Sequence, residues 1–319
     1  MQMSVEWLER HQVALYVAGL TLGAVVGLTW PAVAHPAELA IHLVLALLLY
    51  ATFLGIPFGR IWHAFRDWRF LSTILVVNFI LVPVVVWPVS RIVAHDQVLL
   101  VGVLFVLLTP CIDYVIVFAA PLLMLAQMLL LPLYLWLFVG AELVNSVELG
   151  PFVEAFALII ALPLIAAALT QLAAARWHMG RRIERAVMGA MVPLMVATLA
   201  VVVASQVAGV SASFGSLLLA VPVFILFAAV MVPVGMLAGR VAGLDVPGRR
   251  AIVFSGATRN SLVVLPLVLA LPAAFDLAPL VVVTQTLVEL VAMVAFVLLV
   301  PKVVPGPSGP SELSMTPIW

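Results

Sequence analysis

Long hydrophobic runs separated by short polar segments make up almost the whole chain. A helix needs about 20 apolar residues to cross the hydrocarbon core of a bilayer. Counted at that length, the pattern predicts an all-α integral membrane protein with ten transmembrane helices. Their expected ranges are residues 13–33, 39–58, 70–90, 97–119, 121–140, 151–174, 186–206, 216–238, 251–272 and 279–300.

Two polar interruptions lie inside these hydrophobic runs, at residues 109–114 (TPCIDY) and 255–261 (SGATRNS). Backbone polar groups cannot be left unpaired in lipid, so such breaks survive only inside protein or against a water-filled cavity. Pro110 and Gly256 are the residues that favour breaking the two helices. A matched pair of broken helices, one in each half of a membrane protein, is typical of a transporter's binding site.

The breaks fall in the fourth and ninth predicted helices, at corresponding places in two groups of five. An odd number of helices in each group implies that the second group is inverted in the membrane. We therefore expect a first five-helix repeat at residues 13–140 and a second, inverted repeat at 151–300. Residues 1–12 form a short amino terminus, and the Pro-, Gly- and Ser-rich tail at 301–319 is expected to be disordered.

Composition agrees with insertion in a membrane, since 66% of the residues are hydrophobic and 9% are charged. The net charge of zero gives no indication of a nucleic-acid partner.

Twelve of the 14 basic residues fall on one side of the predicted topology: Arg10, Arg60, Arg66, Arg69, Arg176, Arg181, Arg182, Arg185, Arg240, Arg249, Arg250 and Lys302. Cytoplasmic loops are enriched in Lys and Arg, so we expect both termini in the cytoplasm and the protein in the cell membrane.

Three ionisable residues lie inside predicted helices, namely Asp113, Arg259 and Glu289. Such residues are costly in a bilayer and are candidates for function. If the broken helices cross, Asp113 and Arg259 can pair. Glu289 is then the carboxylate left over, and a buried unpaired carboxylate tends to take up a proton. The alternative is that Glu289 hydrogen-bonds to a neighbouring helix.

The chain has one cysteine, Cys111, directly after Pro110 in the first break. A thiol is a soft ligand that suits thiophilic ions, although a buried cysteine is also an ordinary small packing residue. Other polar side chains could line the same site or join helices by hydrogen bonds. They are Asn78, Gln127, Thr258, Asn260, Ser261 and Gln285.

Four short motifs are similar to those of the bile acid:sodium symporter superfamily, within which the arsenite efflux permease branch matches best. They are residues 78–83 (NFILVP), 109–111 (TPC), 256–260 (GATRN) and 287–289 (LVE). The resemblance implies a panel domain and a core domain, with the fourth and ninth helices crossing in the core. It also implies that Cys111 corresponds to the cysteine required for arsenite transport, and that substrate and cation sites surround the crossing.

The chain departs from that family at several positions. Leu262 stands where the branch has a glutamate, and Arg259 stands where relatives have Asn or Gln. Asp113 follows the cysteine where relatives often have small or apolar residues, and no charged turn separates the fourth and fifth helices. Because a guanidinium is never deprotonated and takes the place of a cation, Arg259 argues against sodium coupling.

These observations predict an exporter of trivalent arsenic (arsenite, and antimonite as a further candidate) driven by protons. Cys111 would make a transient contact with As(III), beside Asp113, Thr258, Arg259 and Asn260. Glu289 would carry the proton, with Asp113 as a second coupling residue. The alternative is an organic-anion carrier of the same fold, in which Arg259 binds a carboxylate. The spans hold no catalytic motif, so neither an enzyme nor a cofactor is expected.

Overall fold

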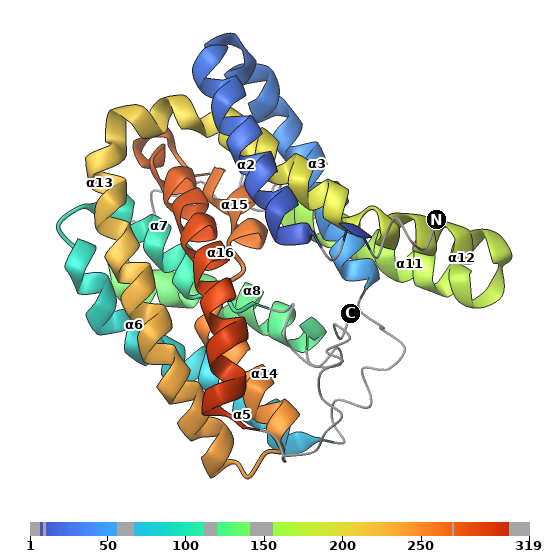
Figure 1. The fold of residues 1–319 in the computed structure, drawn as a ribbon, viewed down its shortest axis with the longest axis vertical. Coiled ribbons are helices and arrows are strands. Elements are labelled where there is room, and N and C mark those ends of the chain that lie inside the picture. Colours follow the sequence, from blue (N-terminus) through green and yellow to red (C-terminus); the bar gives the residue numbers. More distant parts are fainter. Residues whose placement is uncertain are drawn as a thin grey trace.

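The computed structural model describes residues 7–8, 11–55, 67–111, 120–140, 156–269 and 271–305. Within these ranges the chain is all-helical (Figure 1). The α-helices are α2 (Gln12–Thr29), α3 (Ala34–Leu54), α5 (Trp68–Val76), α6 (Val82–Ser90), α7 (Gln97–Leu107), α8 (Ala120–Val139), α11 (Leu162–Arg176), α12 (His178–Gly189), α13 (Met191–Val241), α14 (Val246–Ala257), α15 (Ser261–Leu269) and α16 (Ala278–Val303). Short 3-10 turns are η1 (Pro31–Val33), η4 (Arg91–Val93) and η6 (Ala273–Phe275), and π-helical turns are η3 (Val77–Leu81) and η5 (Phe156–Ala161).

Several of these helices are long and apolar enough to cross a bilayer. Three meet that requirement by themselves, at Pro31–Leu54, Trp68–Val93 and Gly215–Val241. Two bent pairs bring the number to five if each pair counts as one span, and these are His178–Gly189 with Met191–Val207 and Ala278–Met293 with Ala295–Val303. The helices are therefore compatible with a membrane protein. The arrangement in ten spans and two inverted repeats stays a prediction.

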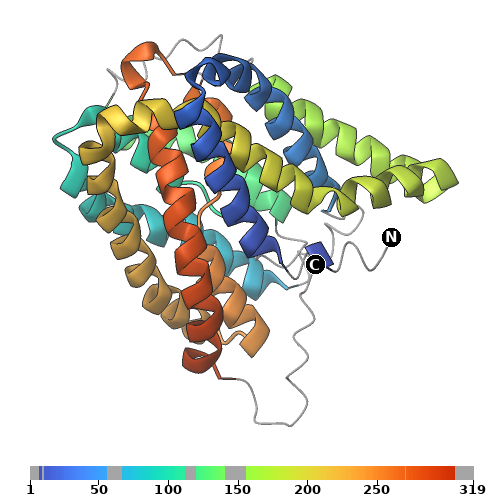
Figure 2. The same cartoon turned by 45° about the horizontal axis from the view of Figure 1, so that its top comes forward.

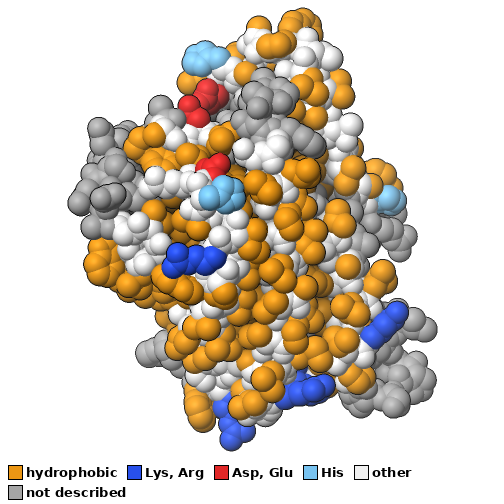
Figure 3. Space-filling view, turned by 90° about the vertical axis from the view of Figure 1, so that its left-hand side faces the viewer, with side chains coloured by type: hydrophobic (Ala, Val, Ile, Leu, Met, Phe, Trp, Pro, Cys, Tyr) orange, Lys and Arg blue, Asp and Glu red, His pale blue; other side chains and the backbone are white. Residues whose placement is uncertain are grey.

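The surface agrees with a membrane-facing belt. Figure 3 shows one side of the molecule covered by hydrophobic side chains across its middle. Most of the basic side chains on this side lie toward the lower end, and the acidic ones lie toward the upper end. Apolar side chains on long helices, such as Leu43, Val84 and Leu237, are 64% exposed. Lipid is the solvent in which such exposure carries no cost.

Two predicted loops are helical instead. The sequence predicts a loop between the seventh and eighth helices, from residue 206 to 216, but α13 continues through that segment as one helix. The segment holds small residues and no proline, so the backbone hydrogen bonds continue through it. Figure 1 shows α13 turning over the top of the molecule and then descending. The predicted basic loop after the sixth helix forms α12, which lies beside α11 and extends away from the other helices (Figure 2).

A stripe of glycines joins α2 to the first part of α13. Gly19, Gly23 and Gly27 recur every four residues, so they lie on one face of α2. A Cβ on Gly23 would lie 2.4 Å from the carbonyl oxygen of Ala200, and one on Gly27 would lie 2.6 Å from that of Ala204. Glycine is thus required for this close approach, as at small-residue helix contacts in membranes.

The main buried cluster draws residues from most of the helices, namely α3, α5–α8, α11, α13 and α14–α16, including Phe105, Phe227, Ile252 and Val281. Figures 1 and 2 agree that α16 runs alongside the second part of α13. The described parts of the two polar interruptions are buried, as Thr109, Cys111, Ser255 and Arg259 show, so the packing of these helices determines where the candidate site forms.

We expect Gly23→Val to destabilise the protein, because the added side chain would collide with the backbone of α13 at Ala200. Overpacking of this kind typically costs about 1–3 kcal/mol. The measurement is the midpoint of thermal unfolding in detergent. The control is Leu22→Val on the neighbouring residue, which is 60% exposed. Equal midpoints for the two variants would contradict the close α2–α13 contact.

Candidate functional site

The described chain leaves the helical conformation at the start of the first predicted break and at the second. Helix α7 ends at Leu107, and residues 109–111 continue without helical structure. Helix α14 ends at Ala257, and α15 begins at Ser261. The hydroxyl groups of Thr109 and Thr258 act alike, since each donates over 2.7 Å to the carbonyl four residues earlier, in Phe105 and Phe254.

The two breaks meet. Pro110 and Arg259 form an antiparallel β-bridge, and the backbone N–H of Asn260 donates to the carbonyl oxygen of Thr109 over 3.2 Å. This pairing supplies hydrogen bonds for backbone groups that helices would otherwise satisfy. It also places Cys111, which is 2% exposed, directly beside the second break. Asp113 and the rest of residues 112–119 lie outside the described residues.

Arg259 is the central residue of this region. Its side chain is 2% exposed, and its Nη2 donates to the carbonyl oxygens of Ser255 (2.6 Å) and Gly256 (2.7 Å). Nη2 also lies 3.1 Å from Oδ1 of Asn78, and Nη1 donates to the carbonyl oxygen of Leu107 over 3.2 Å. The guanidinium therefore binds oxygen atoms at the ends of α7 and α14 and on η3. Its carbon Cζ lies 5.3 Å from the ring centre of Phe227, which adds a cation–π contact.

Asn78 orients this arrangement from the π-helical turn η3. Its Nδ2 donates to the carbonyl oxygen of Ile74 (3.0 Å) and to Oγ of Ser255 (3.1 Å), which leaves Oδ1 to accept from Arg259. The hydroxyl of Ser255 in turn donates to the carbonyl oxygen of Cys111 over 3.3 Å. A π-helical turn widens the helix and frees backbone groups. One of them, the carbonyl of Phe79, accepts from the hydroxyl of Tyr134 on α8 over 2.6 Å.

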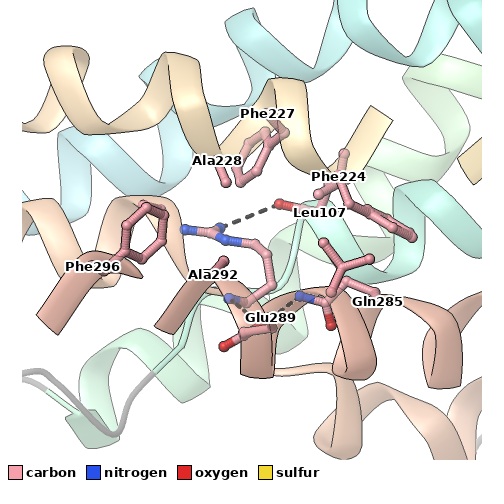
Figure 4. A pocket seen from close by; sticks show the side chains of 11 residues that line it. Leu107, Phe224, Phe227, Ala228, Gln285, Glu289, Ala292 and Phe296 are labelled. Atoms are coloured by element: carbon pink, nitrogen blue, oxygen red, sulfur yellow. Dashed lines mark hydrogen bonds between the residues drawn. The ribbon is translucent and has the colours of Figure 1, made fainter. Parts of the chain in front are cut away.

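Glu289 connects α16 to the same break. Its Oε2 accepts from the backbone N–H of Arg259 over 3.2 Å and from Nε2 of Gln285 one helical turn earlier. Figure 4 shows the Gln285 and Glu289 side chains next to each other, with the dashed bond between them. The sequence-based alternative of a hydrogen-bonded Glu289 therefore agrees with these contacts.

A cavity of about 10 Å³ lies between Arg259, Gln285 and Glu289 (Figure 4). Its other lining residues are apolar: Leu107, Phe224, Phe227, Ala228, Ala257, Val288, Ala292 and Phe296. Two buried atoms of lining residues, Nε of Arg259 and Oε1 of Gln285, have no hydrogen-bond partner within the described ranges. One is a donor and the other an acceptor, and the volume suits a single water-sized molecule.

The remaining predicted residues lie at varying distances from this centre. Ser261 bonds to Thr286 of α16 through their hydroxyls (2.8 Å), and Thr258 bonds to its own helix. Gln127 is buried on α8 and does not line the cavity at Arg259. The expected pairing of Arg259 with Asp113 falls outside the described residues, and the described partners of the guanidinium are uncharged oxygen atoms.

Sequence reasoning missed some contributors to the site. Ser255 links Asn78 to Cys111, and its position four residues before Arg259 was the available signal, since residues so spaced share a helix face. The carbonyl of Leu107 carries no sequence signal at all. In the part of the chain that the structure describes, no three His, Cys, Asp or Glu side chains gather in a group that could hold a metal ion.

Comparison with known proteins adds no family assignment. No protein-family model matches the chain, and no curated protein sequence matches it. The resemblance to the bile acid:sodium symporter superfamily therefore stays a prediction that rests on the four motifs.

We expect Arg259→Met to destabilise the protein by about 3–5 kcal/mol, because its oxygen partners would be buried without a donor. Arg259→Lys should recover only part of the loss, since an ammonium lacks the planar fork of donors. Thermal unfolding in detergent measures both changes. The control is Arg182→Met at an exposed position of α12. A similar midpoint for Arg259→Met and the control would mean that the guanidinium does not hold the breaks together.

Proposed function

We propose that the protein is a secondary active transporter whose substrate site is the contact between the two broken helices. The observation that carries the proposal is the antiparallel pairing of Pro110 with Arg259, inside a protein whose long helices are apolar. Non-helical backbone within a membrane protein is tolerated where it is buried in protein or lines a water-filled cavity, and transporter binding sites are built from such interrupted helices. Transport then proceeds by movement of one group of helices against the other around this site.

The substrate that we propose is trivalent arsenic. Cys111 follows directly on the paired Pro110, and its carbonyl is held by the Ser255 hydroxyl, so its backbone has a fixed position in the site. A thiolate is a soft ligand that suits As(III). The chain has a single cysteine. One thiol gives a contact that can be released, whereas several would hold arsenic too tightly for a carrier.

The occupied donors of the site favour an uncharged substrate over an organic anion. Arsenous acid is a small neutral hydroxide at neutral pH. An organic carboxylate would need the fork of Arg259, but both terminal nitrogens already donate to protein oxygens. The organic-anion alternative therefore has less support than the arsenite proposal.

Protons are the coupling ion that we propose, with Glu289 as the carrier. When ionised, its carboxylate can accept from the Arg259 backbone and from Gln285. Protonation turns one oxygen into a donor and weakens this acceptor role. Because the bond from the Arg259 N–H joins α16 to the break before α15, the protonation state of Glu289 changes how firmly the two elements are held together. Arg259 supplies a permanent positive charge, so no sodium ion is required.

We propose export across the cell membrane, with both termini in the cytoplasm. The support is the distribution of basic residues along the sequence and their gathering toward one end in Figure 3. Cytoplasmic segments carry the excess of Lys and Arg.

The first functional prediction concerns Cys111. In a bacterial strain that lacks arsenite efflux, the wild type should lower intracellular arsenic, and Cys111→Ser at matched expression should abolish most of that effect. The reason is that a hydroxyl is a hard ligand with little affinity for As(III). The matched control is Thr198→Ser, another small change at a buried residue, on α13.

A binding measurement separates substrate recognition from transport. Arsenite should protect the chain's single thiol in the purified protein from alkylation by maleimide. Unchanged efflux in Cys111→Ser would remove the thiol from the mechanism. Absence of both efflux and protection in the wild type would contradict arsenite as the substrate.

The second functional prediction concerns Glu289. In proteoliposomes, a pH gradient should drive arsenite flux through the wild type, while Glu289→Gln should exchange arsenite without responding to the gradient. Glutamine keeps the size of the side chain and one acceptor oxygen but cannot titrate. Glu38→Gln, at an exposed position on α3, is the control. A variant that still responds to the pH gradient would show that the proton binds elsewhere.

A further inference from the structure

A second hollow lies on the surface, apart from the Arg259 cavity and sharing no lining residue with it. It is a groove of about 500 Å³ between α5–η3 and the last turns of α13. Val76 and Leu81 line one wall, Leu237 and Val241 line the other, and Ser72 and Thr73 are its polar members. From Ser72 to Leu81 the helix rises roughly 13 Å.

Both walls belong to helices that are long and apolar enough to span a bilayer. They are Trp68–Val93 and Gly215–Val241, two of the three helices that meet this requirement alone. The side chains on the groove are exposed as well as apolar, with Val76 43%, Leu237 64% and Val241 81% exposed. An open apolar groove on such helices faces lipid, so an acyl chain is the molecule that fits it.

Two arginines lie near one end of the groove, together with the helix-capping carboxylates of Asp67 and Asp245. The hydroxyls of Ser72 and Thr73 donate to the backbone carbonyl of Arg69, so this arginine lies one turn before the groove on α5. Arg240 lies between Leu237 and Val241 on α13, and both arginines are exposed. These helix ends are neighbours, because Phe70 comes within 3.6 Å of the Cβ position of Gly248, shortly after α13 ends.

We propose that this groove binds one acyl chain of an anionic phospholipid, with the phosphate at Arg69 and Arg240. The apolar walls receive the chain, and the two guanidinium groups attract the negative headgroup. Trp68 supports a position of this headgroup site at the membrane interface. It is 66% exposed beside Arg69, and tryptophan favours the interface.

The groove also borders the candidate transport site. Val77 lines the groove, and its Cγ1 lies 3.2 Å from the position that a Cβ on Gly256 would take. Val77 begins the π-helical turn that carries Asn78, and the carbonyl of Gly256 accepts from Arg259. A bound acyl chain would therefore pack against the backbone that positions the Asn78–Arg259 contact.

Native mass spectrometry of the purified full-length protein tests the proposal, independently of any transport activity. The probes are palmitoyl-oleoyl phosphatidylglycerol and the matching phosphatidylcholine, supplied in equal amounts. The monomer should retain more phosphatidylglycerol than phosphatidylcholine. Arg69→Gln and Arg240→Gln should each lower that retention roughly fivefold, the effect of removing one basic residue near an anionic lipid.

A second variant tests the groove itself. Ala238→Phe places a ring in the groove and should abolish retention of phosphatidylglycerol. The controls are Ala175→Phe and Arg182→Gln, at exposed positions of α11 and α12, and both variants should bind phosphatidylglycerol as the wild type does. Thermal unfolding checks that each variant is folded. Equal retention of the two lipids by the wild type would overturn the proposal, as would unchanged retention in Ala238→Phe. A dimer mass that Ala238→Phe removes would assign the groove to a second copy and also overturn it.

Discussion

The structure depends on one constraint, which is that backbone carbonyls at interrupted helix ends need donors where water is excluded. Arg259 supplies them from within the second break. Its guanidinium binds the carbonyl oxygens of Leu107, Ser255 and Gly256 and the side chain of Asn78. Since these atoms belong to α7, α14 and η3, one side chain joins the three elements that form the site. A residue with fewer donors could not satisfy them together.

A permanent cation in this position bears on the proposed transport function. The carboxylate of Glu289 accepts from the backbone N–H of Arg259, so it lies beside the second break without binding the guanidinium itself. Under the proposed function, the fixed charge of Arg259 argues against an additional sodium ion, and Glu289 is the carboxylate that we propose as the titrating group. A neutral substrate agrees with this proposal because it adds no charge of its own.

The sequence predicted the interruptions because lipid tolerates unpaired backbone groups so poorly. A proline, a glycine and several polar residues within apolar runs indicate a break, and residues 109–111 and 258–260 do leave the helical conformation. Partners that are backbone atoms, such as the carbonyl of Leu107, have no side-chain signature. The continuity of α13 was missed because a bend can form without breaking the helix, and hydrophobicity alone does not distinguish a bend from a loop. The glycine stripe of α2 has a spacing that sequence reasoning could have used.

The π-helical turn Val77–Leu81 connects the buried site to the surface groove. Inserting a residue into a helix shifts the faces of the residues that follow. Here Asn78 is fully buried and bonds to Arg259, while Val77 and Leu81 line the groove. The turn is held by the Tyr134 hydroxyl on Phe79 and by the Asn78 amide on Ile74. A change in the turn would alter the acceptor that Asn78 offers to Arg259 and the shape of the groove together, so the proposed lipid would act on the geometry of the site through the same five residues.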